Sequence, residues 1–516
     1  MSREKRTKKD SLKKRESKAT VGGGGGGGGL DSSRATPDPK QRRDVPAGEA
    51  APMRYTLARP KPSDFEQSRA PVFMSHHEVE DLDGKTIEFF ETSEHVFNKK
   101  NYHYTHCIAD PAFPSMFFYR QTEPEPYGAH MSFEDTASHI FFDKAGSHVT
   151  SYKGFRMARA NVAVREGRWY WECKITRGIL KKRGADDPES HGHVRVGWAR
   201  REASLDAPVG FDAYSYGIRD VAGQKVHMSR PKDFFPPGED LREGDVIGLE
   251  IQLPSESLHR KVVLGQYNPA VDLLDEGADH GAEASNIIRD RIPIRFKSHI
   301  YFEESDYHTV KELEDLMNPS PMSSSGSHGS PEKPNPNHPV PALRTLPNSH
   351  VKVYKNGVLM GTAWTGLLAF LPPASKKPPQ PTQPAGRDCP DDGSLGYYPA
   401  VSVFRVLESS SLNGQPMEAG DTEMKDAGSN GVGDEGGSGS EQPKTIPRNE
   451  ARPVSDRYAD QIVEDIVFDI VDEVGFWIED GCKVVDRSYK DEKAGEVAGL
   501  VAGGAREEIK ELVQDD

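Results

Sequence analysis

Cysteine is scarce in this chain of 516 residues. Its four cysteines, Cys107, Cys173, Cys389 and Cys482, lie far apart and form no CxxC pair. Their spacing supports neither a zinc ribbon nor a disulfide framework, and it fits a reducing compartment. No apolar run approaches the ~20 residues that span a bilayer, and no apolar signal segment stands at the N-terminus. We therefore expect a soluble, intracellular protein without a membrane partner.

Catalytic sequence patterns are also missing. The chain has no GxSxG, no HExxH, no Walker loop and no GxGxxG after a strand. His103, His106 and Cys107 lie close together in NYHYTHC, but no fourth metal ligand follows at workable spacing, so polar and packing roles are the better interpretation. Glu303 and Glu304 are interpreted as solvated surface. We predict no catalytic residue, no metal, no cofactor and hence no enzyme.

Apolar residues other than glycine are sparse as well, at 35% of the chain. Polar stretches rich in Gly, Pro and Ser cannot bury enough apolar surface to offset their ordering entropy. One core domain with disordered inserts is therefore expected. The predicted division is a disordered basic, Gly-rich tail at 1–71, a β domain at 85–408 with inserts at about 254–288, 318–348 and 372–393, an acidic Gly/Ser linker at 409–450, a helix at 453–480 and a tail at 481–516.

Charge is unevenly distributed along the chain, whose formal net charge is -15. The run KRTKKDSLKKR makes the N-terminus basic, while the C-terminal third is acidic. Such a basic run is typical of a nuclear import sequence or of weak contact with DNA, and a merely solvated terminus is the alternative. The eight glycines that follow, Gly22 to Gly29, are interpreted as a flexible linker, because no strand precedes them.

Short segments between about 85 and 404 alternate apolar and polar residues, which indicates strands with one buried face. The apolar members include Trp169, Trp171, Cys173 and Ile175, then Val194, Val196 and Trp198, then Ile247, Leu249, Ile251 and Leu253. Asn356-Gly357 predicts a tight hairpin, because its turn type needs positive φ at both residues. We predict antiparallel sheets packed face to face, with the tryptophans in the core rather than stacked on nucleic-acid bases.

Arg195 lies opposite the apolar side of its predicted strand. An arginine on a sheet face can bind the carboxylates of a partner through its planar guanidinium. Simple solvation or an internal ion pair is the alternative for Arg195 and for Arg159.

The segment 453–480 has the apolar spacing of an amphipathic helix. Its stripe consists of Ile462, Val463, Ile466, Val467, Ile470, Val471 and Val474. Leaving such a face in water forfeits roughly 1.5–3 kcal/mol for each side chain that could be buried. The helix is therefore predicted to dock in a groove, on a partner or on its own domain.

Several segments together resemble a SPRY domain and, more narrowly, the Ash-two/Bre-two subunit of the COMPASS histone methyltransferase complex. They are GFRMARANVAVREGRWYWECKI, HVRVGWARREASLDAPVGFDAYSYGIRD, GDVIGLEIQLP, YKNGVLMGTAW and GYYPAVSVF. IRFKSHIYFEESDY is similar to a segment peculiar to that family, and RPVSDRYADQIVEDIVFDIVDEV resembles its C-terminal helix. The fold class implied is a mainly β, SPRY-type antiparallel sandwich with a C-terminal helix.

The resemblance implies a nuclear, non-catalytic scaffold. Its partners would be a WD-repeat subunit, a Dpy-thirty/Sdc-one-like dimer and the SET-domain enzyme that methylates lysine four of histone H3. A basic pocket would receive an acidic segment of the WD-repeat subunit, and the motifs assign to it Arg159, Arg195, Lys153 and Tyr152. The apolar stripe of the C-terminal helix would bind the dimer.

The chain departs from the animal members of this family, because its N-terminus lacks the cysteines of their zinc-finger module. It resembles the fungal members in that respect. DNA contact would then fall to the basic tail, and it would be weak and salt-sensitive. The alternative function is a SPRY adaptor of a ubiquitin ligase, but the scattered cysteines leave no RING and the C-terminal helix favours the scaffold.

Overall fold

The computed structural model describes residues 60–110, 119–152, 154–181, 190–275, 287–289, 291–318, 332–378, 391–405, 451–479 and 509–513. Contacts divide the chain into residues 1–49 and 50–516, and every described residue belongs to the second unit. The predicted tail up to residue 59, the linker 409–450 and Lys153 lie outside the described residues.

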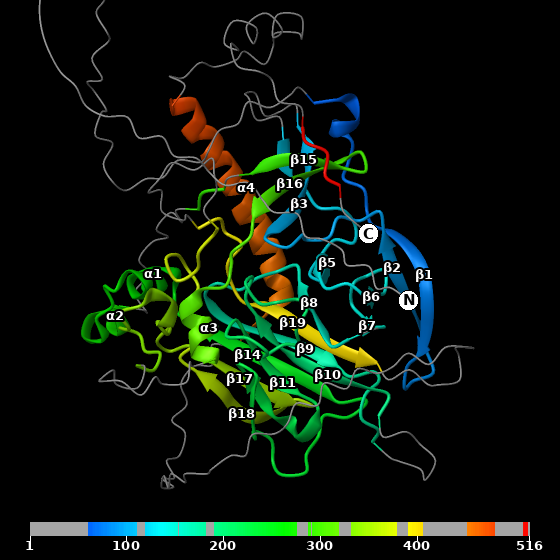
Figure 1. Ribbon diagram of the computed structural model, residues 1–516, viewed down its shortest axis with the longest axis vertical. Helices are drawn as coiled ribbons and strands as arrows, with labels where there is room; N and C mark the ends of the chain where they lie inside the picture. Colours follow the sequence, from blue (N-terminus) through cyan, green and yellow to red (C-terminus); the bar gives the residue numbers. More distant parts are fainter. Residues whose placement is uncertain are drawn as a thin grey trace, which may run out of the picture. The chain divides into compact units, whose positions relative to one another are not determined.

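Two large sheets form the centre of this unit (Figure 1). The seven-stranded sheet has the order β13-β12-β11-β10-β19-β8-β5, with bounds Arg230–Lys232, Lys225–His227, Ser215–Arg219, Gly192–Ala199, Tyr398–Arg405, Arg156–Ala160 and Met131–Thr136. The five-stranded sheet has the order β18-β17-β14-β9-β20, with bounds Val358–Thr365, His350–Lys355, Val246–Leu253, Gly167–Lys174 and Arg452–Pro453. All neighbours in both sheets are antiparallel except the short β20, which runs parallel to β9.

A shared core joins the two large sheets. Val196 and Trp198 of β10 and Leu249 and Ile251 of β14 are buried in one cluster. Trp198 also meets Trp171 of β9 edge to face, with ring centroids 6.2 Å apart. Alternate side chains of each strand therefore supply the core, and the predicted antiparallel sandwich, with its tryptophans inside, is confirmed.

The predicted hairpin at Asn356-Gly357 connects β17 to β18. Both residues have positive φ, 51° and 79°, as the expected turn type requires. Asn356 also accepts a hydrogen bond from the backbone N–H of Val246 through its side-chain oxygen, over 2.8 Å. The turn is thereby tied to the start of the neighbouring strand β14.

Two four-stranded sheets extend the sandwich. One has the order β1-β2-β6-β7, with bounds Val72–Glu80, Thr86–Ser93, Ile140–Phe142 and Val149–Ser151. The other has the order β15-β16-β3-β4, with bounds Ile292–Phe296, His299–Ser305, Tyr102–Ala109 and Tyr119–Gln121. Because β1 pairs with β2 from Val72 onward, the ordered domain begins before the predicted start at residue 85.

The prediction of disorder at 254–288 is wrong for its first half. Two helices lie there, α1 at Glu256–Leu264 and α2 at Pro269–Asp275. The hydroxyl of Ser255 caps α1 by accepting from the N–H of Leu258. Leu258, Val262 and Val263 are buried. These few apolar side chains lie on the inner side of one short helix, which stabilises it although the segment is polar on average.

Parts of the other two predicted inserts are also ordered. Residues 332–348 include the buried side chains of Ala342 and Leu346, beside α3 at Lys311–Met317. Within 372–378, the Ser375 hydroxyl accepts a hydrogen bond from Nη2 of the buried Arg200 over 2.8 Å. Buried contacts with residues distant in sequence therefore hold these polar segments in place.

Both predicted tails contribute to the fold. In residues 60–71, the Asp64 carboxylate accepts two hydrogen bonds from the Arg295 guanidinium, over 2.9 and 3.0 Å. In residues 509–513, Leu512 packs against Ile294 and Phe296 of β15. The disorder predicted for 1–71 and the separate tail predicted at 481–516 are therefore corrected for these residues.

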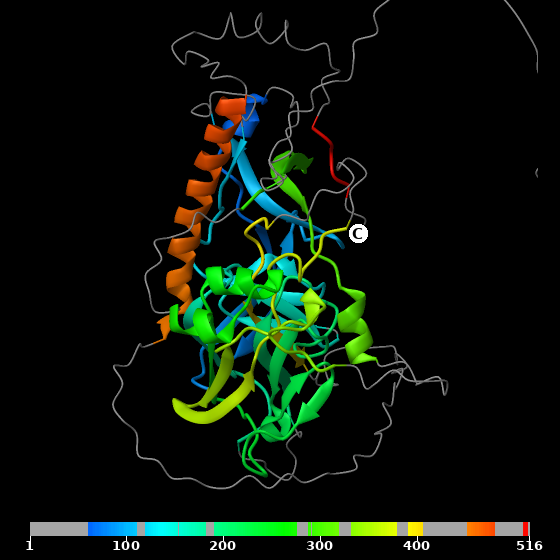
Figure 2. The ribbon, with the colours of Figure 1, turned by 90° about the vertical axis from the view of Figure 1, so that its left-hand side faces the viewer.

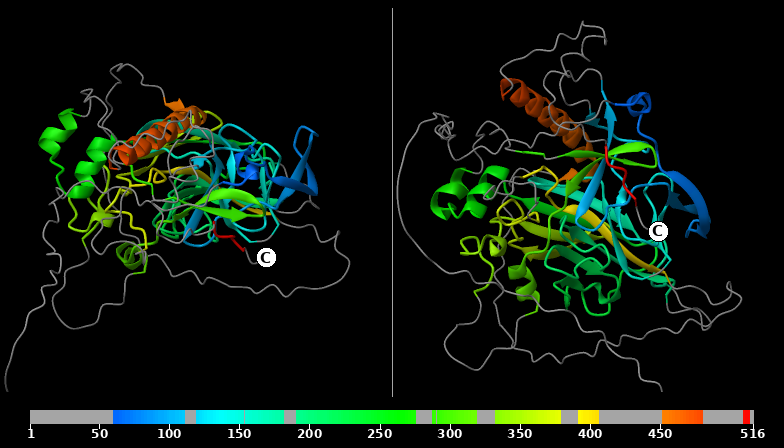
Figure 3. Two further views of the ribbon diagram at one scale, coloured as in Figure 1. Left: turned by 90° about the horizontal axis from the view of Figure 1, so that it is seen from above. Right: turned by 45° about the horizontal axis from the view of Figure 1, so that its top comes forward.

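The predicted C-terminal helix is confirmed as α4, at Val454–Glu479. It lies along one side of the strands (Figure 2). Figure 3 shows α4 at the periphery of the described elements in two further views. No described helix has both the length and the apolar character needed to cross a membrane.

Candidate partner-binding surfaces

The side of α4 that faces the sandwich is largely polar. Arg457 is buried, donates from Nε to the carbonyl oxygen of Ala163 over 3.1 Å, and forms an ion pair with Glu464. Tyr458 donates its hydroxyl to Glu123. Gln461 and Asp465, further along the same side, also contact the domain at Ala163 and Arg289, so one defined side of the helix is held against it.

Further contacts fix the start of the helix. Val454 is buried in the main core cluster. Just before it, β20 pairs with β9, and the Arg452 guanidinium lies 4.6 Å from the centre of the Trp169 ring. The sequence analysis left open whether the helix docks on a partner or on its own domain. The structure docks its first turns on the sandwich.

The opposite side of α4 is apolar and exposed. We call this surface the outer stripe, and its described members are Ile462, Val463, Ile466, Val467 and Ile470. Ile466 and Ile470 are 55% and 52% exposed. The side chains of Val471 and Val474 lie outside the described residues. The usual arrangement of a surface helix is thus reversed, because polar residues face the domain and apolar residues face solvent.

Arg195 lies on the face of β10 that points away from the sandwich core. Its guanidinium lies 5.1 Å from the centre of the Phe155 ring, and Phe155 meets Phe404 of β19 edge to face. Across the strand pair, Arg195 is directly opposite Arg219 of β11. We call these four residues the basic-aromatic patch. The sequence analysis missed Arg219, Phe155 and Phe404, although the alternation of the strand at 215–219 places Arg219 on the same face as Arg195.

The electrostatics of the basic-aromatic patch favour an acidic ligand. Burial and the adjacent charge of Arg219 lower the pKa of Arg195 to about 10. Arg195 therefore remains charged at neutral pH. The nearby charge of Asp220 offsets part of the lowering, but the described ion pairs include none between Arg195 and a carboxylate. A carboxylate placed here would offset the desolvation of Arg195 and its repulsion from Arg219.

Arg159 is in the interior and only 2% exposed. Its guanidinium donates two hydrogen bonds to Asp135, over 2.8 and 2.6 Å. A third nitrogen donates to the carbonyl oxygens of Arg200 and Arg201. Arg159 thus forms the internal ion pair that the sequence analysis left open, and it holds the segment after β10 rather than facing a partner.

Tyr152 is exposed, and its ring centre lies 5.8 Å from that of His76. The structure therefore leaves Tyr152 accessible to a ligand. Lys153, its neighbour in the predicted pocket, lies outside the described residues.

The residues of NYHYTHC do not form one site. His103 faces Glu304 and Asp392, next to Lys377 and Arg291, in a buried network of ion pairs. Cys107 is buried in an apolar cluster, where desolvation raises its pKa. His106 instead meets His95 and Glu134, which the sequence analysis did not single out. Alternation places His106 on one face of β3 and both His103 and Cys107 on the other, where the last two stand four positions apart along the strand.

The fold and these surfaces define the chain as an antiparallel β-sandwich protein whose C-terminal helix exposes an apolar face. No protein-family model matches the chain. Its curated relatives include "COMPASS component cclA" of Colletotrichum higginsianum, 63% identical over 99% of this chain and 89% of that protein. They also include "Set1 complex component ash2" of Schizosaccharomyces pombe, 36% identical over 82% of this chain and 52% of that protein.

These identities place the chain plainly in the family of COMPASS components that includes cclA and ash2, as its motifs predicted. Among solved structures, a human SPRY domain aligns with 54% of this chain and 92% of that chain, at 11% identity and a TM-score of 0.21. That alignment carries no argument, so the fold assignment depends on the sheets described above.

Proposed function

We propose that this protein is a non-catalytic scaffold subunit of a nuclear COMPASS-type complex that methylates lysine four of histone H3. Membership of a family whose relatives are named as complex components supports this proposal. The observation that carries it is the outer stripe of α4. Large apolar side chains gathered on one exposed face are typical of a protein–protein interface.

The partner proposed for the outer stripe is a Dpy-thirty/Sdc-one-like dimer. Two paired helices form an apolar groove into which an amphipathic helix can lay its apolar face. The docked inner side of α4 supports this proposal, because it presents the outer stripe in one fixed orientation. Presenting a helix that is already formed reduces the ordering entropy lost on binding.

The partner proposed for the basic-aromatic patch is an acidic segment of a WD-repeat subunit. Arg195 would contact its carboxylates directly. The exposed Tyr152 is a proposed neighbour, and so is Lys153, which lies outside the described residues. Arg159 would act indirectly as a positioning residue. It bonds the carbonyl groups of Arg200 and Arg201, and the same loop bonds Arg195 through the carbonyl oxygen of Val209.

The test is purification of the tagged full-length chain from nuclei of its own cells, followed by identification of its partners by mass spectrometry. We expect a SET-domain protein, a WD-repeat protein and a small helical dimer to co-purify with the chain in reproducible proportions. Recovery of ubiquitin-ligase subunits in their place would favour the adaptor alternative. If the purified chain alone methylated histone H3 peptides, the non-catalytic assignment would be wrong.

A further inference from the structure

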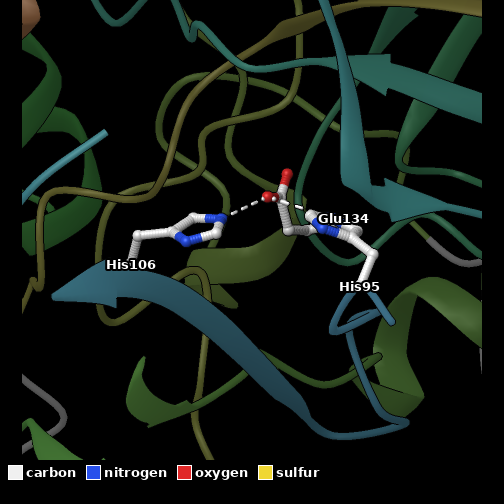
Figure 4. Close-up of side chains that lie close together, drawn as sticks. All are labelled: His95, His106 and Glu134. Atoms are coloured by element: carbon white, nitrogen blue, oxygen red, sulfur yellow. Dashed lines mark hydrogen bonds and ion pairs between the residues drawn. The ribbon is translucent and has the colours of Figure 1, made fainter. Parts of the chain in front are cut away.

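Two imidazoles converge on one carboxylate oxygen where β2, β3 and β5 approach one another. Nε2 of His106, on β3, lies 2.8 Å from Oε1 of Glu134 on β5. Nε2 of His95, just after β2, lies 3.1 Å from the same oxygen. Figure 4 shows both rings directed at Glu134 from opposite sides. Three donor atoms of the types that zinc prefers thus face one another.

The separations suit a small divalent ion. Zinc bonds of about 2 Å at tetrahedral angles place ligand atoms about 3.3 Å apart, so a modest outward movement of the two rings would admit the ion. His95 is only 4% exposed, and the contact of its Nε2 with Glu134 lacks the alignment of a good hydrogen bond. Such a contact leaves a buried nitrogen incompletely satisfied, and a metal ion would satisfy it.

A second layer of hydrogen bonds orients two of the three ligands. The Ser68 hydroxyl lies 3.0 Å from Nδ1 of His106, which directs the Nε2 of that ring at Glu134. The Ser132 hydroxyl donates to Oε2 of Glu134 over 3.0 Å, which leaves Oε1 to face the two histidines. Such partners fix the tautomer of a metal-binding histidine and the direction of a metal-binding carboxylate.

A polar cavity of about 160 Å³ adjoins the group and is lined by His106 and Glu134. That cavity leaves room for a water molecule as the fourth ligand.

We propose that His95, His106 and Glu134 form a binding site for a divalent transition-metal ion, with zinc favoured by two imidazoles and one carboxylate. This differs from the absence of metal that the sequence pattern predicts. The ion would join the end of β2 to β3 and β5, and so fasten the N-terminal strands to the sandwich. The proposal does not depend on the partners proposed above.

The neighbouring group His103, Glu304 and Asp392 does not carry the same proposal. Lys377 pairs with Asp392, and Arg291 lies 3.4 Å from Glu304. Cations already neutralise those carboxylates, so a metal ion would have to displace them. His103, on the same strand as His106, therefore provides a matched control.

The experiment uses the tag-free full-length chain, stripped with a chelator and titrated with cobalt(II), a spectroscopic substitute for zinc. We expect one equivalent to bind, with the visible absorption of a low-coordinate cobalt site, and zinc to displace it. His95→Gln and His106→Gln should each weaken binding by at least tenfold, since glutamine can still donate to Glu134 but is a poor metal ligand. Ser68→Ala should weaken it by about 10–100-fold.

Two controls decide whether the uptake is specific. His103→Gln should bind cobalt as the wild type does. The double variant His76→Gln, His77→Gln, called the β1 variant, removes two neighbouring histidines outside the proposed site. It should also leave uptake unchanged. The proposal fails if the folded wild-type chain takes up no cobalt, if both site variants bind it normally, or if only the β1 variant loses it.

Discussion

Arg289 donates a hydrogen bond from Nη1 to Oδ1 of Asp465 over 3.0 Å, which ties the middle of α4 to the segment before β15. Its Nη2 donates to the carbonyl oxygen of the same residue over 3.1 Å, and its guanidinium lies 5.3 Å from the centre of the Phe468 ring. The Arg289 side chain is largely buried, so these contacts hold α4 in one rotation about its axis. The outer stripe faces solvent as a consequence.

Replacing Asp465 by Ala should loosen α4 without unfolding the sandwich. A hydrogen bond between charged groups contributes about 1.5–3 kcal/mol. We expect faster amide hydrogen exchange in residues 458–470 and little change in β10 or β14. Asp460→Ala is the control, since Asp460 lies on the same helix but forms only an exposed ion pair with Arg452 of β20. Equal exchange in both variants would contradict the anchoring role of Asp465.

Changing Ile466 and Ile470 to Asp should abolish co-purification with a Dpy-thirty-like dimer, because it places charges in an apolar groove. Both side chains are more than half exposed, so the thermal unfolding temperature of the chain should change little. Val358→Asp is a matched control, because Val358 is an exposed apolar residue away from the helix. If the double variant still retained the dimer, the outer stripe would not be its binding surface.

Periodicity predicted the regular parts of this molecule well. Alternation at Trp198 and Leu249 identified the sandwich, and the spacing of Ile462, Ile466 and Ile470 identified α4. Those patterns repeat over neighbouring residues, so the sequence alone contains them. The sequence pattern could not predict which side of α4 faces the domain. That orientation depends on a contact with Arg289, which is distant in the chain.

Two of the errors share one physical cause, because the residues concerned meet only when separate strands fold together. The family motifs assigned Arg159 to a partner, and its buried counter-ion, Asp135, could not be identified because it lies on another strand at no informative spacing. The helix α1 was missed because few apolar side chains support it within a polar insert. His95 and Glu134 had no motif to mark them, since only the folding of separate strands brings them to His106.

Arg195→Glu should weaken binding to an acidic peptide from the WD-repeat subunit by about tenfold or more at low ionic strength, and by less as salt screens the charges. Isothermal titration at two salt concentrations measures this. Lys232→Glu reverses an exposed charge on β13 of the same sheet and should have a smaller effect. Equal losses in both variants would indicate a general charge effect and not a site at Arg195.

His227 should make the stability of the sandwich depend on pH. Its ring stacks on Tyr216 with centroids 4.2 Å apart, and its Nδ1 donates to the carbonyl oxygen of Ser215 over 2.9 Å. Burial, with the charges of Arg230 and Lys232, lowers the pKa of His227 to about 4, against about 6.5 in an unfolded chain. Between these values the unfolded state binds the extra proton.

The contribution of His227 to the free energy of unfolding is therefore fully present above pH of about 6.5, and it is lost as the pH falls toward 4. Urea unfolding at pH 7 and pH 5 measures this, and the loss from His227 is at most roughly 2 kcal/mol. His227→Gln should lose correspondingly less stability over the same interval than the wild type. His76→Gln, at an exposed position, should behave as the wild type does. Parallel losses in the wild type and in His227→Gln would mean that His227 is protonated in the folded protein without cost.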